Sequence, residues 1–294
     1  MASLKDLRDK IKGVGTTRQI TSAMKLMATA RVGGAIRAVK ETQGYIERLI
    51  GIISQVAYKA RQSEIRSGLY VEGEIKKVCN IVVGGERGLC GSFNYDLHDL
   101  AYKEIKKTHI SEQTVIVIGK RPVQYLKVRG IPVHQHFDDL PMYDVDRLSV
   151  KLLALSREIF KDYKKHKYDM VNIIYTSFNS AASMKPVAKQ IFPIVPHHAL
   201  EPTLRGKSTL DYLYDFEPEP LAMLYHLQPR YIYFSLLTSA LESYAAEQVS
   251  RMNAMTSAND RAEEMMEELN TTLNRIRQSA ITQEIIEVIS GSVC

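Results

Sequence analysis

The sequence predicts an α/β protein whose two ends pair as a long antiparallel helical coiled coil beside an α/β domain with a mainly parallel sheet. All ten prolines lie between Pro122 and Pro229, and proline breaks the interior of a helix, so both ends can form very long helices. The ends also carry opposite charge. Residues 1–60 hold eleven Lys or Arg against four Asp or Glu, a net +7, and residues 241–294 hold four against nine, a net −5. This indicates that the ends meet, or that each meets a charged partner.

The N-terminal helix is assigned to residues 1–60, where apolar residues repeat at alternating steps of three and four. The repeat begins at Leu4, Leu7, Ile11 and Val14, and it resumes at Val32, Ala35, Val39, Ile46, Leu49, Ile53 and Val56. Between these runs the frame falls on Arg18, Thr21 and Lys25, whereas apolar residues stand at Ile20, Ala23, Met24 and Met27. We therefore expect the apolar stripe to slip there and to change how the helix winds on its partner.

The C-terminal helix is assigned to residues 221–294, because residues 231–290 lack glycine as well as proline. The same step runs through Met252, Met255, Asn259, Ala262, Met266, Leu269, Leu273, Ile276 and Ala280, of which Asn259 alone is polar. A helix much longer than about 25 residues with this repeat is typical of a coiled coil, so we expect it to pair with residues 1–60. One buried asparagine can fix the register of such a pair; the alternative is that Asn259 faces solvent.

Residues 75–200 alternate between short apolar segments and amphipathic ones. Strands are predicted at Val78–Gly84, Thr114–Gly119 and Met170–Phe178, with an edge strand at Lys189–Val195, and helices at Phe93–Lys107, Pro122–Arg129 and Val145–His166. This alternation predicts a Rossmann-like domain, in which helices cover both faces of a mainly parallel sheet. The proline-rich stretch 196–230 is predicted to be irregular, with 201–220 as the connection to the C-terminal helix.

A glycine-rich loop, Gly84-Gly85-Glu86-Arg87-Gly88-Leu89-Cys90-Gly91, follows the first predicted strand. Dinucleotide-binding folds place their phosphate loop at this position. However, the spacing is not G-x-G-x-x-G, no Walker Lys-Ser/Thr follows, and Glu86 would repel phosphate. We therefore favour a tight turn that displays Arg87 to a protein partner, with a nucleotide site as the alternative.

Catalytic and metal-binding patterns are missing from the sequence. The pairs His134-x-His136 and His197-His198 have no nearby cysteine or patterned carboxylate, so we expect ordinary surface histidines and no metal centre. No Gly-x-Ser-x-Gly elbow is present. The sequence therefore predicts neither a hydrolase nor a cofactor.

The cysteines and the apolar runs bear on the compartment. Cys79, Cys90 and Cys294 offer no disulfide framework, which suits a reducing compartment. No apolar run is long enough to span a membrane. Asp6 and Asp9 argue against an organelle transit peptide.

Four segments carry a family resemblance. Residues 281–292 (ITQEIIEVISGS) fit the signature I-T-x-E-x-x-E-x-x-x-G-[AS], and residues 17–28 are similar to T-x-x-I-T-x-A-M-x-M-V-A. Residues 85–94 are similar to S-D-R-G-L-C-G-G-F-N, with Gly85-Glu86 in place of Ser-Asp, and residues 212–214 match Y-L-Y. Together they resemble the gamma subunit of the F-type ATP synthase across essentially the whole chain. The cysteine-bearing regulatory insertion of the chloroplast form is missing.

The resemblance implies a central rotor shaft. Such a shaft transmits rotation of the proton-driven c-ring to the catalytic ring of alpha and beta subunits for ATP synthesis, and in reverse serves ATP-driven proton pumping. The chain would be a non-catalytic subunit that needs no cofactor. Its partners would be the alpha, beta and epsilon subunits and the c-ring, with no nucleic acid and no insertion into the membrane. It would lie as a peripheral protein on the cytoplasmic face of a bacterial plasma membrane.

The resemblance also implies contact residues. Those expected against the ring of alpha and beta subunits are Met24, Lys25, Arg87, Glu247, Arg251, Arg277, Gln278 and Thr282. Arg87 is expected to meet an acidic lever of the catalytic subunit, or, in the alternative, merely to solubilise its turn. Those expected at the c-ring and epsilon foot are Tyr212, Tyr214 and Glu217. Packing in the coiled-coil core is the alternative for Met24, and it is favoured for Met255 and Met266.

Two other classes of function stay open at this point. A stand-alone nucleotide enzyme would bind nucleotide as an isolated chain, which the broken glycine spacing disfavours. A coiled-coil adaptor at nucleic acid would need one basic face and would bind with a steep salt dependence. The basic residues of 1–60 surround the helix instead, and Tyr45 and Tyr58 alone could stack on bases there.

Overall fold

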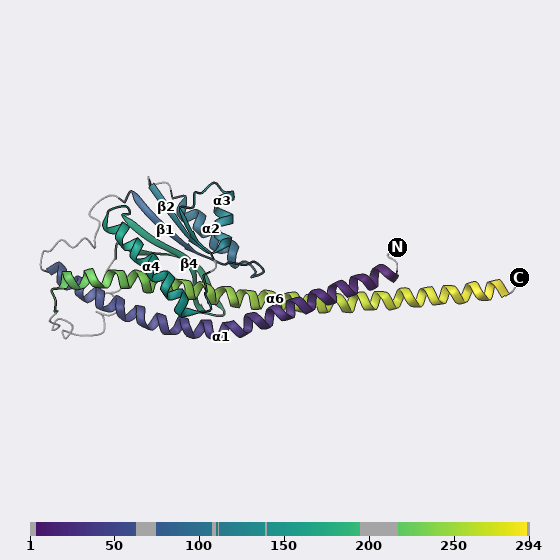
Figure 1. The fold of residues 1–294 in the computed structure, drawn as a ribbon. Helices are drawn as coiled ribbons and strands as arrows, with labels where there is room; N and C mark the ends of the chain where they lie inside the picture. The colour runs from purple at the N-terminus through teal and green to yellow at the C-terminus, as the bar shows by residue number, and fades with distance from the viewer. Residues whose placement is uncertain are drawn as a thin grey trace.

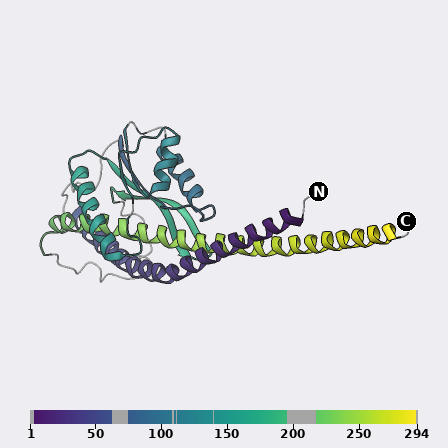
Figure 2. The same cartoon turned by 45° about the vertical axis from the view of Figure 1, so that its right-hand side comes forward.

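Two helices from opposite ends of the chain dominate the molecule. The computed structural model describes residues 4–62, 75–107, 110, 112–138, 140–194 and 217–292. Helix α1 (Leu4–Gln62) and helix α6 (Pro220–Ser292) run side by side in opposite directions, and the α/β domain lies against one end of the pair (Figure 1). Both termini lie at the other end, away from the domain (Figure 2). The predicted fold class is therefore confirmed.

The sheet has five strands in the order β3-β2-β1-β4-β5. Its strands are β1 (Lys77–Val83), β2 (Glu112–Ile118), β3 (Gln135–Phe137), β4 (Met170–Ser180) and β5 (Ser183–Phe192). All neighbours pair in parallel except β4 and β5, which form an antiparallel hairpin. The predicted edge strand at Lys189–Val195 was displaced: β5 starts six residues earlier, because Ala181 and Ala182 make a turn that returns the chain along β4.

Helices cover both faces of the sheet, as predicted. Helices α2 (Phe93–Ile105) and α3 (Lys120–Val128) pack on one face, where Val82, Val115 and Val117 point. Helix α4 (Val145–Lys164) and the two long helices share the core on the other face. The pair of helices α1 and α6 therefore forms part of the core of the α/β domain.

Polar contacts add to this packing where β4 extends beyond the end of its pairing with β1. Strand β1 pairs with β4 only as far as Ile174, so the next residues of β4 have no strand on that side. At Phe178 the backbone N–H donates to Oε2 of the buried Glu242 of α6 at 3.0 Å. Gln43 of α1 donates from Nε2 to the other carboxylate oxygen, also at 3.0 Å. One side chain of α6 thus joins both long helices to the sheet.

The seam between α1 and α6 follows the predicted repeat, but the predicted slip of the stripe was wrong. Thr21 is 9% exposed, whereas Ile20 and Met27 are 57% and 55% exposed. The frame is kept because its polar residues find partners across the seam. Thr21 Oγ1 donates to Asn259 Oδ1 at 3.2 Å, and the neighbouring Arg18 forms an ion pair with Glu263.

Helix α6 begins inside the stretch 196–230 that was predicted to be irregular. Pro220 is its first residue, where a missing N–H costs nothing because it would have no partner within the helix. Pro229 lies within the helix and removes one hydrogen bond. Leu224 and Ile232 on either side are buried against the core, which holds the segment helical. Across the described ranges, no helix has an apolar stretch that could cross a membrane.

Candidate functional site

The glycine-rich loop lies at the carboxyl edge of the sheet, between β1 and α2, and is pinned to the connection between β2 and α3. The N–H of Gly84 donates to the carbonyl of Ile118 at 2.9 Å. A Cβ atom on Gly84 would lie 2.4 Å from Cγ of Pro122, and one on Gly119, which has φ +101°, would lie 2.4 Å from the carbonyl oxygen of Gly84. Only glycine permits this approach of the two loops.

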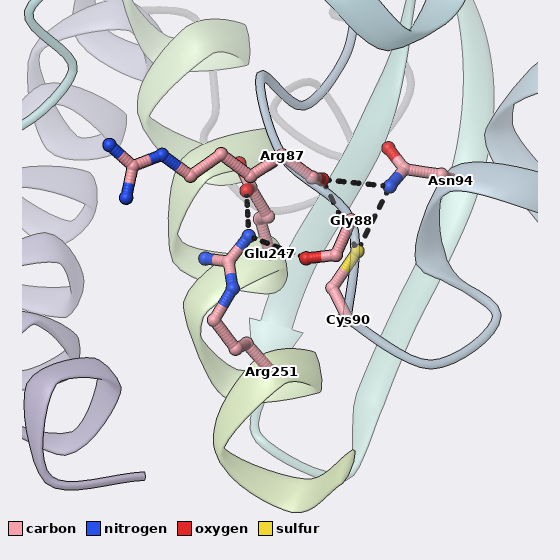
Figure 3. A network of polar contacts seen from close by, with 6 residues as sticks. All are labelled: Arg87, Gly88, Cys90, Asn94, Glu247 and Arg251. Carbon is pink, nitrogen blue, oxygen red and sulfur yellow. Dashed lines mark hydrogen bonds and ion pairs between the residues drawn. The ribbon is translucent and has the colours of Figure 1, made fainter. Parts of the chain in front are cut away.

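A buried ion pair of α6 lies beneath the loop (Figure 3). Arg251 and Glu247, one helical turn apart, are each 8% exposed and pair with each other. Arg251 also donates from Nη2 to the carbonyl of Gly88 at 3.4 Å. Burial raises the pKa of Glu247, and the guanidinium groups of Arg251, Arg87 and Arg31 oppose that rise. The pair therefore supports the loop from within the chain; a partner contact for either residue stays a prediction.

The outer part of the loop is held by α2. Asn94 donates from Nδ2 to the carbonyl of Arg87 at 3.1 Å and to Sγ of Cys90 at 3.0 Å. Cys90 is buried, and this burial raises the pKa of its thiol. The side chain of Arg87 is exposed and points away from the network (Figure 3). The loop thus displays a cation from a fixed backbone.

The space inside the loop does not suit a phosphate group. A Cβ atom on Gly85 would lie 3.2 Å from Cδ of Glu247, so the carboxylate of Glu247 lies directly against the backbone of the loop. A carboxylate in this position provides no donor for a phosphate, and its negative charge opposes phosphate binding. The geometry therefore disfavours the nucleotide alternative.

Of the two histidine pairs, His134 and His136 lie within the described residues. Nδ1 of His134 accepts a hydrogen bond from the backbone N–H of Val115 at 3.0 Å, which occupies one of its two ligand atoms. The described residues hold no group of three or more His, Cys, Asp or Glu placed to bind a metal ion. His197 and His198 lie outside these residues.

A second candidate surface is the outer face of α1 near the N-terminus. Met24 and Lys25 are half-buried at the edge of the seam. Beside them Ile20, Leu26 and Met27 are more than half exposed. A groove of about 490 Å³ runs between the two helices here, lined by residues that include Gln19, Ser22, Leu26 and Met266. An exposed apolar patch of this kind marks an interaction surface.

A third surface is the tip of α6. Arg277, Gln278 and Thr282 are exposed, and the hydroxyl of Thr282 donates to the carbonyl of Gln278 within the helix. The prediction omitted the apolar residues of this tip, which are also exposed: Ile281, Ile285, Ile286, Val288 and Ile289. Their position past the last seam residue, Ala280, was the available signal.

The foot is described in part. Glu217 is exposed, and Tyr212 and Tyr214 lie outside the described residues. At this end of the shaft the Nζ atom of Lys164 lies 4.2 Å from the ring centroid of the exposed Tyr225, where α4 meets the start of α6. Sequence reasoning missed this cation–π contact, because its two residues are 61 positions apart.

Comparisons with known proteins agree over nearly the whole length. A family model described as ATP synthase matches residues 3–293. The ATP synthase gamma chain of Heliobacterium modesticaldum is 33% identical over 298 residues, and that of Paracoccus denitrificans is 32% identical over 301 residues. In both cases the alignment covers 99% of each chain.

Solved structures share the fold. A chain from the rotor of the Euglena gracilis mitochondrial ATP synthase has a TM-score of 0.62 at 16% identity, covering 95% of this chain and 98% of that one. A chain from the central stalk and c-ring of the Tetrahymena thermophila mitochondrial enzyme has a TM-score of 0.58 at 21% identity, with 81% of this chain and 99% of that one covered.

Proposed function

The chain belongs to the family of ATP synthase gamma chains, and from this premise we propose that it is the central rotor shaft of a bacterial F-type ATP synthase. Gamma chains are subunits of a multisubunit enzyme. The shaft carries rotation from a proton-driven c-ring to the ring of alpha and beta subunits, where ATP is made. In reverse, ATP hydrolysis in the ring turns the shaft and pumps protons.

The observation that carries the proposal is the exposure of apolar side chains at the tip of α6. Five large apolar side chains between Ile281 and Ile289 are 44–72% exposed on a single helix. A large exposed apolar surface marks a site that binds a partner. A helix end without tertiary contacts also gains little stability on its own. A sleeve of alpha and beta subunits would cover this tip on all sides.

The shaft is asymmetric, which a rotary mechanism requires. The α/β domain, whose glycine-rich loop carries Arg87, lies on one side of the helix pair (Figure 1). The exposed apolar residues Ile20, Leu26 and Met27 all belong to α1. As the shaft turns, each catalytic subunit meets a different face. Differential contacts with these faces shift the balance between open and closed states of the subunit.

Catalysis is assigned to the ring and not to this chain. The carboxylate of Glu247 lies against the glycine-rich loop, where its charge opposes phosphate binding. The foot, with Glu217 and the contact between Lys164 and Tyr225, is assigned to the c-ring and the epsilon subunit. We further propose that the chain lies as a peripheral protein on the cytoplasmic face of the plasma membrane.

Truncation of the tip tests the proposal. The chain lacking residues 282–294 is assembled with alpha and beta subunits, and the torque of ATP-driven rotation is measured. We expect lower torque with intact pairing of α1 and α6, because the deleted residues lie beyond the seam. Torque equal to that of the full chain would remove the tip from the coupling surface.

Calorimetry with ATP tests the competing class. We expect the isolated full-length chain to bind no ATP at micromolar concentrations, since the loop offers no phosphate site. Tight binding of ATP would support the hypothesis of a stand-alone nucleotide enzyme and would contradict the assignment of catalysis to the ring.

A further inference from the structure

Leu89, at the tip of the glycine-rich loop, combines two unfavourable features. Its side chain is 65% exposed, and its backbone has φ +61°, in the left-handed region. An L-residue is disfavoured there because its Cβ crowds the following carbonyl oxygen, and glycine is the residue that avoids this cost. The loop already uses glycine at the neighbouring positions Gly88 and Gly91.

His166 is the other non-glycine residue with positive φ in the described part of the chain, at +54°. Its conformation has an ordinary explanation, because it follows the C-terminus of α4, where helices commonly end with a left-handed residue. Its N–H donates to the carbonyl of Tyr163, which closes the last turn. Leu89 ends no helix, so this explanation does not apply to it.

The conformation of Leu89 is imposed by the contacts on both sides of it. Arg251 holds the carbonyl of Gly88 from below, and Asn94 holds the carbonyl of Arg87. On the other side, the N–H of Phe93 donates to the carbonyl of Cys90 at 3.3 Å. The chain therefore fixes an apolar side chain toward water, at a backbone cost, which is typical of residues retained for contact with a partner.

The surroundings of Leu89 define the chemistry of that partner. Arg87 is exposed beside it. Arg121 is also exposed and lies over Gly88, since a Cβ atom there would lie 3.0 Å from Nη2 of Arg121. An apolar knob flanked by two guanidinium groups complements an acidic segment that carries an apolar pocket.

We propose that Leu89 is an apolar anchor by which the loop binds an acidic segment of the catalytic ring, seated in a pocket beside the carboxylate that Arg87 meets. The proposal rests on the proposed function, because it takes the ring as the partner. The fixed loop pre-organises the anchor, so binding requires little ordering of the loop. Arg87 supplies attraction, and Leu89 supplies contact that is insensitive to salt.

The test uses the assembled enzyme with Leu89→Gly, Leu89→Asn and Leu89→Met. Glycine and asparagine both accept the left-handed backbone but remove the apolar anchor, whereas methionine keeps an apolar side chain of similar size. We expect the first two to lower ATP-driven turnover by about fivefold or more at unchanged or higher melting temperature. Leu89→Met retains turnover within about twofold. His166→Gly is the matched control: it relieves the same backbone strain and leaves turnover unchanged.

Salt dependence separates the two loop residues. The loss in Leu89→Gly should persist at high salt, whereas the loss in Arg87→Glu should shrink, because salt screens an exposed charge contact. Turnover of Leu89→Gly and Leu89→Asn within about twofold of the parent would overturn the anchor, with or without an effect of Arg87→Glu. Failure of the parent chain to assemble with the ring would instead overturn the proposed function.

Discussion

Replacing Glu242 by leucine tests whether one side chain joins the shaft to the sheet. Leucine roughly keeps the side-chain volume, so the change removes the acceptors without opening a cavity. The carboxylate accepts hydrogen bonds at 3.0 Å from the N–H of Phe178 and from the amide of Gln43. Both donors lose their partner in the variant.

The expected cost follows from the burial of the two donors. The N–H of Phe178 is buried, and a buried donor without an acceptor costs about 1–3 kcal/mol. Gln43 is half-buried, so its amide regains water and the loss there is about 1 kcal/mol. We therefore expect Glu242→Leu to lower the free energy of unfolding by about 2–4 kcal/mol.

Urea unfolding of the full-length chain measures this cost, and hydrogen exchange of the Phe178 amide locates it. Glu263→Leu is the control, since its ion pair with Arg18 joins two side chains that are 41% and 55% exposed, and exposed pairs contribute about 0–1 kcal/mol. Equal destabilisation by the two changes, or unchanged protection of Phe178, would refute the role assigned to Glu242.

Three further predictions concern the loop, the seam and the outer face of the sheet. Arg87→Glu slows ATP-driven turnover at low salt while the melting temperature stays unchanged, because the exposed cation contributes to contact and not to folding; unchanged turnover at low salt removes Arg87 from the coupling surface. Leu269→Pro abolishes assembly, because proline inside the paired part of α6 costs about 3 kcal/mol or more; a normal yield of complex would contradict a continuous helix at residue 269. Burial, with the nearby Arg121 and Arg129, lowers the pKa of His98 from 6.5 to about 4. Between these two pH values the unfolded chain binds a proton at His98 that the folded chain does not bind. The contribution of His98 to the free energy of unfolding is therefore fully present above pH 6.5 and is lost as the pH falls toward 4. His98→Phe should flatten this part of the pH–stability curve, and an unaltered curve would exclude His98 as its cause.

The fold was largely predictable because its signals are periodic. The repeat through Met255 and Ala262 gave the seam of α6, and both residues are buried. The alternation of apolar segments gave the parallel strands β1, β2 and β4. The hairpin of β4 and β5 was placed less well, because β5 is half-exposed along most of its length and lacks a continuous apolar run.

The slip of the stripe on α1 was predicted wrongly because hydrophobicity alone was used to trace the seam. Thr21 takes a seam position because its hydroxyl reaches Asn259, a residue 238 positions away. Ile20 and Met27 are apolar for another reason than the seam, since they face outward. The residues that flank Thr21 or Asn259 in the sequence do not indicate that the two side chains form a hydrogen bond.

The position of the candidate site in the glycine-rich loop was predictable from the sequence, but the contacts that hold the loop were not. The exposure of Arg87 follows from its glycine-rich surroundings, as expected. The burial of Glu247 and Arg251 under the same loop does not follow from sequence, because charged residues on a helix are ordinarily exposed and the loop lies some 160 residues earlier in the chain. Nothing in the sequence distinguishes Leu89 from other leucines, because its unusual feature is its backbone conformation.

The pairing of α1 with α6 has a consequence for biosynthesis. At a synthesis rate of about 5–20 residues per second, the ribosome needs about 12–46 s to proceed from the end of α1 at Gln62 to the end of α6 at Ser292. Until α6 has been synthesised, the apolar seam of α1 lacks the helix with which it pairs. The main core also includes Leu236, Leu241 and Val249 of α6, so the sheet cannot bury its inner face until the last quarter of the chain emerges. Folding is therefore completed after release, and the nascent chain depends on protection from aggregation while it waits for its own C-terminus.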